Sequence, residues 1–365
     1  MPYACVVPVD GPGARPVLDK KKTIIGAIVG VVALAVIFLR VIPQIGSHED
    51  AVVAIRGMST QAIALIVLAV LVYNVVYGFP FMAATPTLRY RHAFQLNQGA
   101  FAISNGIPAG GAFGLGVQYA MLASYGVPPT SATAAIGAVG VWSIFVTLGL
   151  PVLGLLAIAA SNTIATGPYV YVGVVGLAVL LAMIVVFGLV MRSQRLAERV
   201  GSTANKVAGA ALRRLRKGKE INFVPIVVDF RRDIVTLVRR RWAAITATQL
   251  SVSFTQFLIL FASLRGVEGA HASTSFLVAF GAFAVSQIGI MIPITPGGLG
   301  TVDAFLIALL TSMGVSSGDA TAATLVWRAA SFVPQITIGV VSLVTWSHRA
   351  ARTFATSTST STSSS

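Results

Sequence analysis

Stretches of about twenty apolar residues recur along this chain, and they restrict its fold more than any other feature. They cover residues 23–42, 61–80, 132–160, 170–191, 242–264 and 321–346. An α-helix needs ~20 residues to cross ~30 Å of hydrocarbon, so each stretch predicts a membrane-spanning helix. Only 10% of the 365 residues are charged, against roughly a quarter in soluble domains. We therefore expect an all-α, polytopic bundle of transmembrane helices.

Two further apolar regions, 93–123 and 276–313, are interrupted by proline and glycine. The interrupting residues are Pro108, Gly110 and Gly111 in the first region and Pro293, Pro296, Gly297, Gly298 and Gly300 in the second. Proline removes a helical hydrogen bond, and glycine weakens the helix that remains. Each region should form two half-helices around a non-helical turn, in a hairpin that is re-entrant or crosses twice. At membrane depth such a turn needs cover from protein or from a wet cavity.

Positive charge sets the expected orientation. Segment 192–241 holds 14 Lys/Arg and 4 Asp/Glu, a balance of 14 − 4 = +10, and loops of this kind stay in the cytoplasm. If each broken region crosses the membrane an even number of times, every basic cluster falls inside. Both termini are then cytoplasmic, and we expect a multi-pass protein of the plasma membrane. The expected parts are a cytoplasmic tail (1–22), a first membrane half (23–191), a basic cytoplasmic loop with amphipathic helices (192–241), a second membrane half (242–348) and a low-complexity tail (349–365).

The two broken regions match each other at an offset of 188 residues (296 − 108 = 188). Pro108 corresponds to Pro296 and Gly110 to Gly298. On the expected topology one copy starts outside and the other inside, which makes an inverted repeat. Paired Gly/Pro-interrupted segments in two halves point to the binding site of a transporter. Alternatively, the glycines only permit close helix packing; the prolines favour the transporter interpretation, because packing does not require them.

Asp303 and Arg328 are the clearest charges inside the predicted hydrocarbon zone. Burying either one alone costs several kcal/mol, so we expect them to pair. Two interpretations stay open: a structural ion pair, or a role in head-group binding or proton coupling. An arginine can hold a phosphate in bidentate fashion. Thr295 and Thr301 flank the second turn and would add hydroxyl ligands.

No pattern for catalysis or for a resident cofactor is found. The four histidines lack metal-ligand spacing, and the glycine-rich turns match no nucleotide-binding loop. We expect no enzyme, no metal site and no nucleic-acid partner, because topology accounts for the net charge of +15. The expected partners are membrane lipids and an envelope-synthesis enzyme. In the basic loop, Val227, Phe230, Ile234 and Leu237 form an apolar stripe that suits a helix lying on an anionic leaflet.

The run from Pro293 to Asp303, with Gly314 and Arg328 behind it, resembles the lysylphosphatidylglycerol synthase transmembrane-region family, whose members are also described as flippase-like. The resemblance is strongest over 276–346 and weaker over 60–160. It implies a role in moving lipids or lipid-linked molecules between leaflets. Some members carry a soluble aminoacyl-transfer domain; since this chain ends shortly after its last predicted helix, we do not expect synthase activity.

Two positions depart from the family pattern. The acidic position after the glycine loop is here the shorter carboxylate Asp303. The first-half loop lacks the acidic residue that many relatives have there, and Gln118 is its nearest polar residue. Any role shared by two family carboxylates is therefore in question for this chain.

The sequence thus predicts a translocase of a lipid or lipid-linked molecule, with its site between the two broken regions. One alternative is a transporter of a small polar or anionic solute. Another is a non-transporting membrane partner of an envelope-building enzyme. The candidate substrate-binding residues are Pro108, Gly110, Gly111, Gln118, Thr295, Pro296, Gly297, Gly298, Gly300, Asp303 and Arg328.

Overall fold

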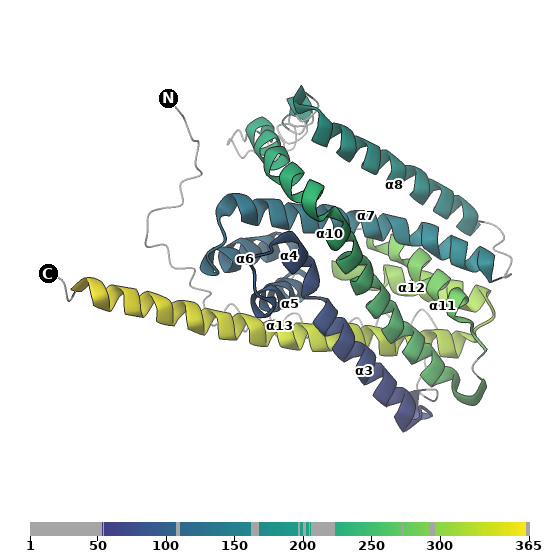
Figure 1. Cartoon of the computed structure of the whole chain (residues 1–365). Helices are drawn as coiled ribbons and strands as arrows, with labels where there is room; N and C mark the ends of the chain where they lie inside the picture. The colour runs from purple at the N-terminus through teal and green to yellow at the C-terminus, as the bar shows by residue number, and fades with distance from the viewer. Residues whose placement is uncertain are drawn as a thin grey trace, which may run out of the picture.

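The computed structural model describes residues 55–106, 110–161, 168–195, 223–271, 273–291 and 296–362, with a few residues near 53 and 200. Within these ranges the chain forms helices and no strand (Figure 1). The helices are α3 (Thr60–Val76), α4 (Phe79–Ala84), α5 (Tyr90–Gly106), α6 (Gly110–Ser124), α7 (Pro129–Ala160), α8 (Pro168–Arg192), α10 (Phe223–Glu268), α11 (Phe276–Ser286), α12 (Thr301–Ser312) and α13 (Ser317–Thr362), with 3-10 turns η3 (Gly269–His271), η4 (Gln287–Met291) and η5 (Pro296–Gly298).

The expectation of an all-α protein with several membrane-length helices is confirmed. Four helical stretches are long and apolar enough to cross a membrane: Thr60–Ala84, Pro129–Ala160, Ile234–Glu268 and Ser317–Arg349. The predicted span 170–191 falls inside α8. The predicted span 23–42 lies outside the described residues.

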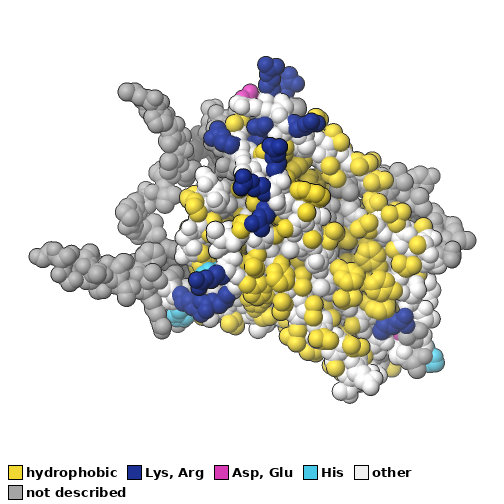
Figure 2. Space-filling model, viewed as in Figure 1, with side chains coloured by type: hydrophobic (Ala, Val, Ile, Leu, Met, Phe, Trp, Pro, Cys, Tyr) yellow, Lys and Arg dark blue, Asp and Glu magenta, His cyan; other side chains and the backbone are white. Residues whose placement is uncertain are grey.

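The outer surface of the bundle is apolar. On α3, large side chains at Leu65, Leu68 and Leu71 are each more than half exposed, and yellow apolar groups cover much of the face seen in Figure 2. A soluble monomer rarely exposes a continuous apolar surface of this extent. The surface instead suits contact with lipid.

Both broken regions form pairs of helices that pack against each other. Gly114 of α6 lies so close to Ser104 of α5 that an added Cβ would overlap the serine hydroxyl. In the second region, a Cβ on Gly289 would lie 2.8 Å from the backbone nitrogen of Val302, at the start of α12. Residues 107–109 and 292–295, which include Pro108 and Thr295, lie outside the described residues.

The two helix pairs lie between α7 and α13, toward opposite ends of the bundle (Figure 1). Each pair packs on both long helices. Gly99 of α5 lies against Leu343 of α13, and Tyr119 of α6 bonds to the Thr133 hydroxyl of α7. Correspondingly, α11 packs on α7 and α12 on α13. Helices from the two halves of the chain therefore pack against each other, so the halves do not form separate domains.

The same turn ends α6 and α12. After α6, Val127 N–H donates to the Leu122 carbonyl at 3.0 Å, and Gly126 has φ +77°. At the corresponding place after α12, Val315 N–H donates to the Leu310 carbonyl at 3.1 Å, and the glycine again has positive φ, +95°. This is the Schellman arrangement, in which a left-handed residue lets the chain satisfy the last helical carbonyls. The repeated Gly-Val dipeptide thus has a direct structural reason.

The second half of the basic segment belongs to α10, which runs without interruption from Phe223 into the membrane-length stretch. Ile234 is fully buried and Leu237 packs beside it, in a cluster that contains Trp142 of α7. This part of the apolar stripe contacts protein, which differs from a helix lying freely on a leaflet. An apolar stripe has the same pattern whether it meets lipid or protein, so the pattern alone does not distinguish the two surfaces.

The crossing of α7 and α11 provides a test of the packing. A Cβ on Gly154 would lie 2.9 Å from the Gly281 carbonyl oxygen, whereas Gly140 on the same helix has no atom within 4 Å of that position. We expect Gly154→Ala to lower the free energy of unfolding by about 1–3 kcal/mol, because the helices must separate. Gly140→Ala should be neutral or slightly stabilising. Thermal unfolding in detergent measures both; equal melting temperatures would contradict this helix crossing.

Candidate functional site

The second break is a turn of left-handed glycines. Gly297, Gly298 and Gly300 have φ values of +64°, +66° and +86°. Only glycine enters this region without a steric penalty from Cβ. The glycines of the Pro-Gly-Gly-Leu-Gly run therefore allow a tight loop, which other residue types would disfavour at these positions. The loop leads directly into α12.

Asp303 caps α12 from the third residue of its first turn. Its Oδ2 accepts a hydrogen bond of 2.8 Å from the Gly300 N–H. The carboxylate also lies at the positive end of the helix dipole, where negative charge is favoured. One oxygen of the Asp303 carboxylate thus accepts a hydrogen bond from the backbone at the second break.

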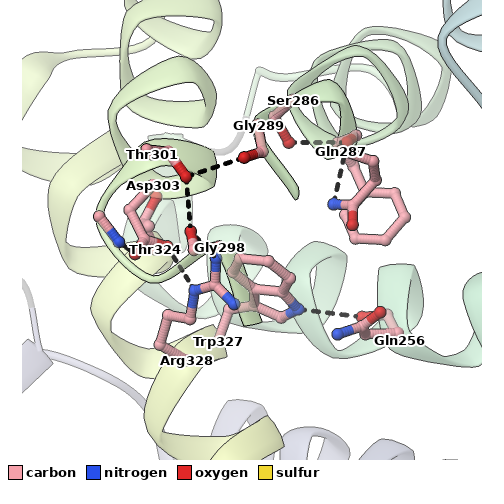
Figure 3. Close-up of polar contacts among 12 residues, drawn as sticks. Gln256, Ser286, Gln287, Gly289, Gly298, Thr301, Asp303, Thr324, Trp327 and Arg328 are labelled. Atoms are coloured by element: carbon pink, nitrogen blue, oxygen red, sulfur yellow. Dashed lines mark hydrogen bonds and ion pairs between the residues drawn. The ribbon is translucent and has the colours of Figure 1, made fainter. Parts of the chain in front are cut away.

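Arg328 of α13 binds the other oxygen. Its Nε pairs with Asp303 Oδ1, and its Nη2 donates to the Gly298 carbonyl at 3.4 Å. Asp303 is fully buried and Arg328 is 2% exposed. Figure 3 shows the two side chains meeting beside the glycine turn. The predicted pairing is confirmed, and the pair fastens the break to α13.

Two aromatic rings flank the guanidinium. The Cζ atom of Arg328 lies 4.5 Å from the ring centre of Trp327 and 5.2 Å from that of Phe332. Such cation–π contacts stabilise a cation that has lost its water. Trp327 is itself held by a 3.2 Å bond from its Nε1 to the Gln256 carbonyl of α10. The ion pair therefore lies in a site that is built from three helices.

Thr301 supports the turn from the other side. Its hydroxyl lies 2.9 Å from the Gly289 carbonyl and 3.1 Å from the Gly298 carbonyl (Figure 3). These carbonyls belong to the two arms of the break. The hydroxyl that the sequence analysis assigned to ligand binding is thus occupied by backbone groups.

The end of the first broken region lies next to this turn. A Cβ on Gly297 would lie 2.8 Å from Asn105 Oδ1, near the end of α5, and 3.1 Å from the Phe332 ring. Phe332 in turn stacks edge-on against Phe101 of α5, with ring centres 5.4 Å apart. The two breaks therefore meet, in what we call the junction (Gly297, Asn105 and Phe332). Sequence analysis missed Asn105 and Phe332, although an asparagine within an apolar region was a usable signal.

The first break is built differently from the second. Gly110 and Gly111 are the first residues of α6, and Gly111 does not have a positive φ. Gly111 has no atom within 4 Å of an added Cβ. Gln118 is partly exposed on α6 and makes no hydrogen bond to the described part of the second break. Of the predicted set, the structure thus brings together Gly297, Gly298, Gly300, Asp303 and Arg328, with the backbone of Pro296 in η5.

Metal ligands do not gather in the described ranges: no three His, Cys, Asp or Glu side chains lie close enough to share an ion. Among the described residues that contact the glycine turn, Asp303 and Arg328 carry the charges. These residues can bind a ligand through hydrogen bonds and through the paired charges of Asp303 and Arg328.

The ion pair yields a sharp stability test. Asp303→Asn and Arg328→Gln should each lower the free energy of unfolding by about 3–5 kcal/mol, because each leaves a buried charge without its partner. The double variant should lose less than the sum of the two. A double-mutant cycle by thermal unfolding measures the coupling; strictly additive losses would mean that the pair does not contribute as a unit.

The chain matches the family described as Lysylphosphatidylglycerol synthase TM region over residues 23–339. A protein of Methanothermobacter thermautotrophicus, named UPF0104 membrane protein, is 26% identical over 348 residues, which cover 89% of this chain and 95% of that relative. The match includes both broken regions and the residues of the ion pair. The chain therefore belongs to the lysylphosphatidylglycerol synthase transmembrane-region family of integral membrane proteins.

Proposed function

We propose that the protein binds a lipid or lipid-linked molecule at the junction and moves its head group across the membrane. The contact of Gly297 with Asn105 and Phe332 carries the proposal, because it brings the two interruptions of the membrane helices to one place. An interrupted helix at membrane depth leaves backbone groups without hydrogen bonds, which costs free energy unless protein or a polar cavity satisfies them. Paired interruptions in two halves of a chain are a recurring design of transporters. We propose this transport role in place of a catalytic one.

We also propose that the two halves form an inverted repeat. The helices α7 and α13 begin at Pro129 and Ser317, which correspond at the offset of 188 residues, and they run in opposite directions in Figure 1. In the same way α5 packs on α13 while α11 packs on α7. An exchange of this kind is expected where two copies of a unit are related by an axis in the membrane plane.

Exposed apolar groups on α6 favour a lipid over a soluble solute. Phe113 and Leu115 are 62% and 50% exposed on the helix that directly follows the first break. Side chains of this type suit contact with acyl chains. A substrate that enters sideways from the bilayer would reach the junction along this helix, whereas a solute would need an enclosed aqueous route.

Basic residues lie together at one end of the bundle. Arg89, Arg91 and Arg349 all act on His92, whose pKa is lowered by partial burial and by these three charges. In Figure 2 most of the Lys and Arg side chains form a band along one edge of the apolar face, and a further basic group lies near the opposite edge. We propose that this edge is cytoplasmic and contacts an anionic leaflet of the plasma membrane. The two termini then lie on the cytoplasmic side.

Single cysteine labels test this topology, after replacement of the native Cys5. Labels at Asn205 and Ala350 should be protected from a membrane-impermeant thiol reagent in intact cells, and a label at His48 should react. Permeabilised cells serve as the control, in which all three must react. Labelling of position 205 from outside would remove the basis for even crossings and for the inverted repeat.

A translocation assay tests the site itself. Vesicles that contain the purified protein and a fluorescent phospholipid are treated with an impermeant quencher, and the rate at which inner-leaflet lipid becomes accessible is measured. We expect Gly297→Ala to slow this rate by about tenfold or more, because the added methyl displaces Asn105 and Phe332. Gly126→Ala is the matched control, since Gly126 has φ +77° and no atom within 4 Å of an added Cβ.

The control separates function from strain. Both variants place alanine in a left-handed conformation at a cost of about 1–2 kcal/mol, but only Gly297→Ala disturbs the junction. Equal rates in the two variants would locate the site elsewhere. If the wild-type protein moves no lipid, a solute transporter or a non-transporting partner of an envelope enzyme becomes the better interpretation.

A further inference from the structure

A second polar cluster lies between α3, α5 and α13, outside the ion pair. It consists of Tyr73, Asn74, Gln98, Ser331 and Gln335, which are all at most 5% exposed. Ser331 and Gln335 lie near the middle of the membrane-length stretch Ser317–Arg349, and Tyr73 near the middle of Thr60–Ala84. The cluster therefore lies at the depth where transporters bind their substrates.

Hydrogen bonds join the three helices at this place. The Tyr73 hydroxyl donates to Gln335 Oε1 at 3.3 Å, and Gln98 Nε2 donates to Asn74 Oδ1 at 2.9 Å. Gly339, one turn beyond Gln335, lies so close to the Gln98 carbonyl that a Cβ would overlap it. The two glutamine side chains thus bond to neighbouring residues of α3, and the Gln98 backbone packs against α13 one turn from Gln335.

Three polar atoms of this cluster are buried without a hydrogen-bond partner in the described part of the chain: Gln98 Oε1, Ser331 Oγ and Gln335 Nε2. The orientation of Gln98 is fixed, because Asn74 donates its Nδ2 to the Val70 carbonyl at 2.8 Å and so presents only its oxygen to Gln98. The free Gln98 atom is therefore an acceptor. Buried polar atoms are rarely left unpaired, so three in one interface point to a bound polar group.

The mixture of free atoms selects the chemistry of that group. Gln98 offers an acceptor, Gln335 offers a donor, and Ser331 can do either. A phosphate oxygen only accepts and would face the Gln98 oxygen unfavourably. An ammonium only donates and would fail to satisfy Gln335. A hydroxyl both donates and accepts, so it satisfies all three.

The charge at the neighbouring ion pair agrees with this selection. Arg328 lies one turn from Ser331 on α13, but its charge is compensated by Asp303. The ion pair therefore does not place a net positive charge beside the cluster. We propose that the interface of α3, α5 and α13 binds an uncharged, hydroxyl-bearing head group, such as that of a glycosyl lipid. The inference rests on the proposed function in one respect, which is that the bound group belongs to the transported molecule.

A binding measurement tests the inference without requiring transport. The protein is placed in phosphatidylcholine nanodiscs, and its thermal unfolding is followed as glucosyl-diacylglycerol, phosphatidylglycerol or a glucosyl-diacylglycerol whose sugar hydroxyls are all methylated is added. We expect the unmethylated glucosyl lipid to raise the melting temperature, because it binds the folded state, and the other two lipids to have little effect. Gln98→Met and Ser331→Ala should each weaken the apparent affinity for the glucosyl lipid by about three- to tenfold.

Thr337→Val is the matched control, since Thr337 is exposed on α13 and bonds only to the Val333 carbonyl of its own helix. This variant should keep the full response. An equal response to phosphatidylglycerol, or an unchanged response in both cluster variants, would overturn the inference and leave the cluster with water alone. Ser331→Ala keeps the test decisive if Gln98→Met does not fold. Binding of the glucosyl lipid without its translocation would instead contradict only the proposed function.

Discussion

A break in a membrane helix leaves backbone groups that lipid cannot satisfy, and the rest of this structure is arranged around that constraint. Among the described residues of the second break, three side chains bind such groups. Asp303 accepts the Gly300 N–H, Arg328 binds the Gly298 carbonyl, and Thr301 binds the carbonyls of both arms. Because Asp303 and Arg328 also bind each other, neither charge is left alone in the apolar interior.

The ion pair also connects parts of the chain that are far apart in sequence. Phe332 contacts the Arg328 guanidinium on one side and Phe101 of α5 on the other. Any movement of α13 at this level therefore acts on both breaks. The long helix α13 thus contacts both helix pairs and connects them at the candidate site.

Periodicity and composition predicted the helices well, because apolar length is itself the requirement for crossing a bilayer. The glycine turn and the pairing of Asp303 with Arg328 were also predictable, since left-handed backbone and buried charge each permit few solutions. The contact between the two breaks at the junction was not predictable from the sequence. Nothing local marks Asn105 as a neighbour of Gly297, because that contact depends on how two hairpins pack. The occupation of Thr301 by backbone carbonyls was equally invisible, since a hydroxyl suits a ligand and a carbonyl alike.

The residues that fasten the second break have no counterparts in the first half. At the offset of 188 residues, the positions of Asp303 and Arg328 hold Leu115 and Gly140 in the first half. Two of the three left-handed glycines correspond to Ala109 and Ala112, and alanine disfavours that conformation. The first half thus lacks the two charged residues of the fastening and two of the three glycines of the turn. The second break is thus held to α13 by a buried ion pair, whose separation would leave two unpaired charges, whereas α5 contacts the same helix through uncharged groups such as Gln95, which donates to the Thr345 hydroxyl at 3.1 Å.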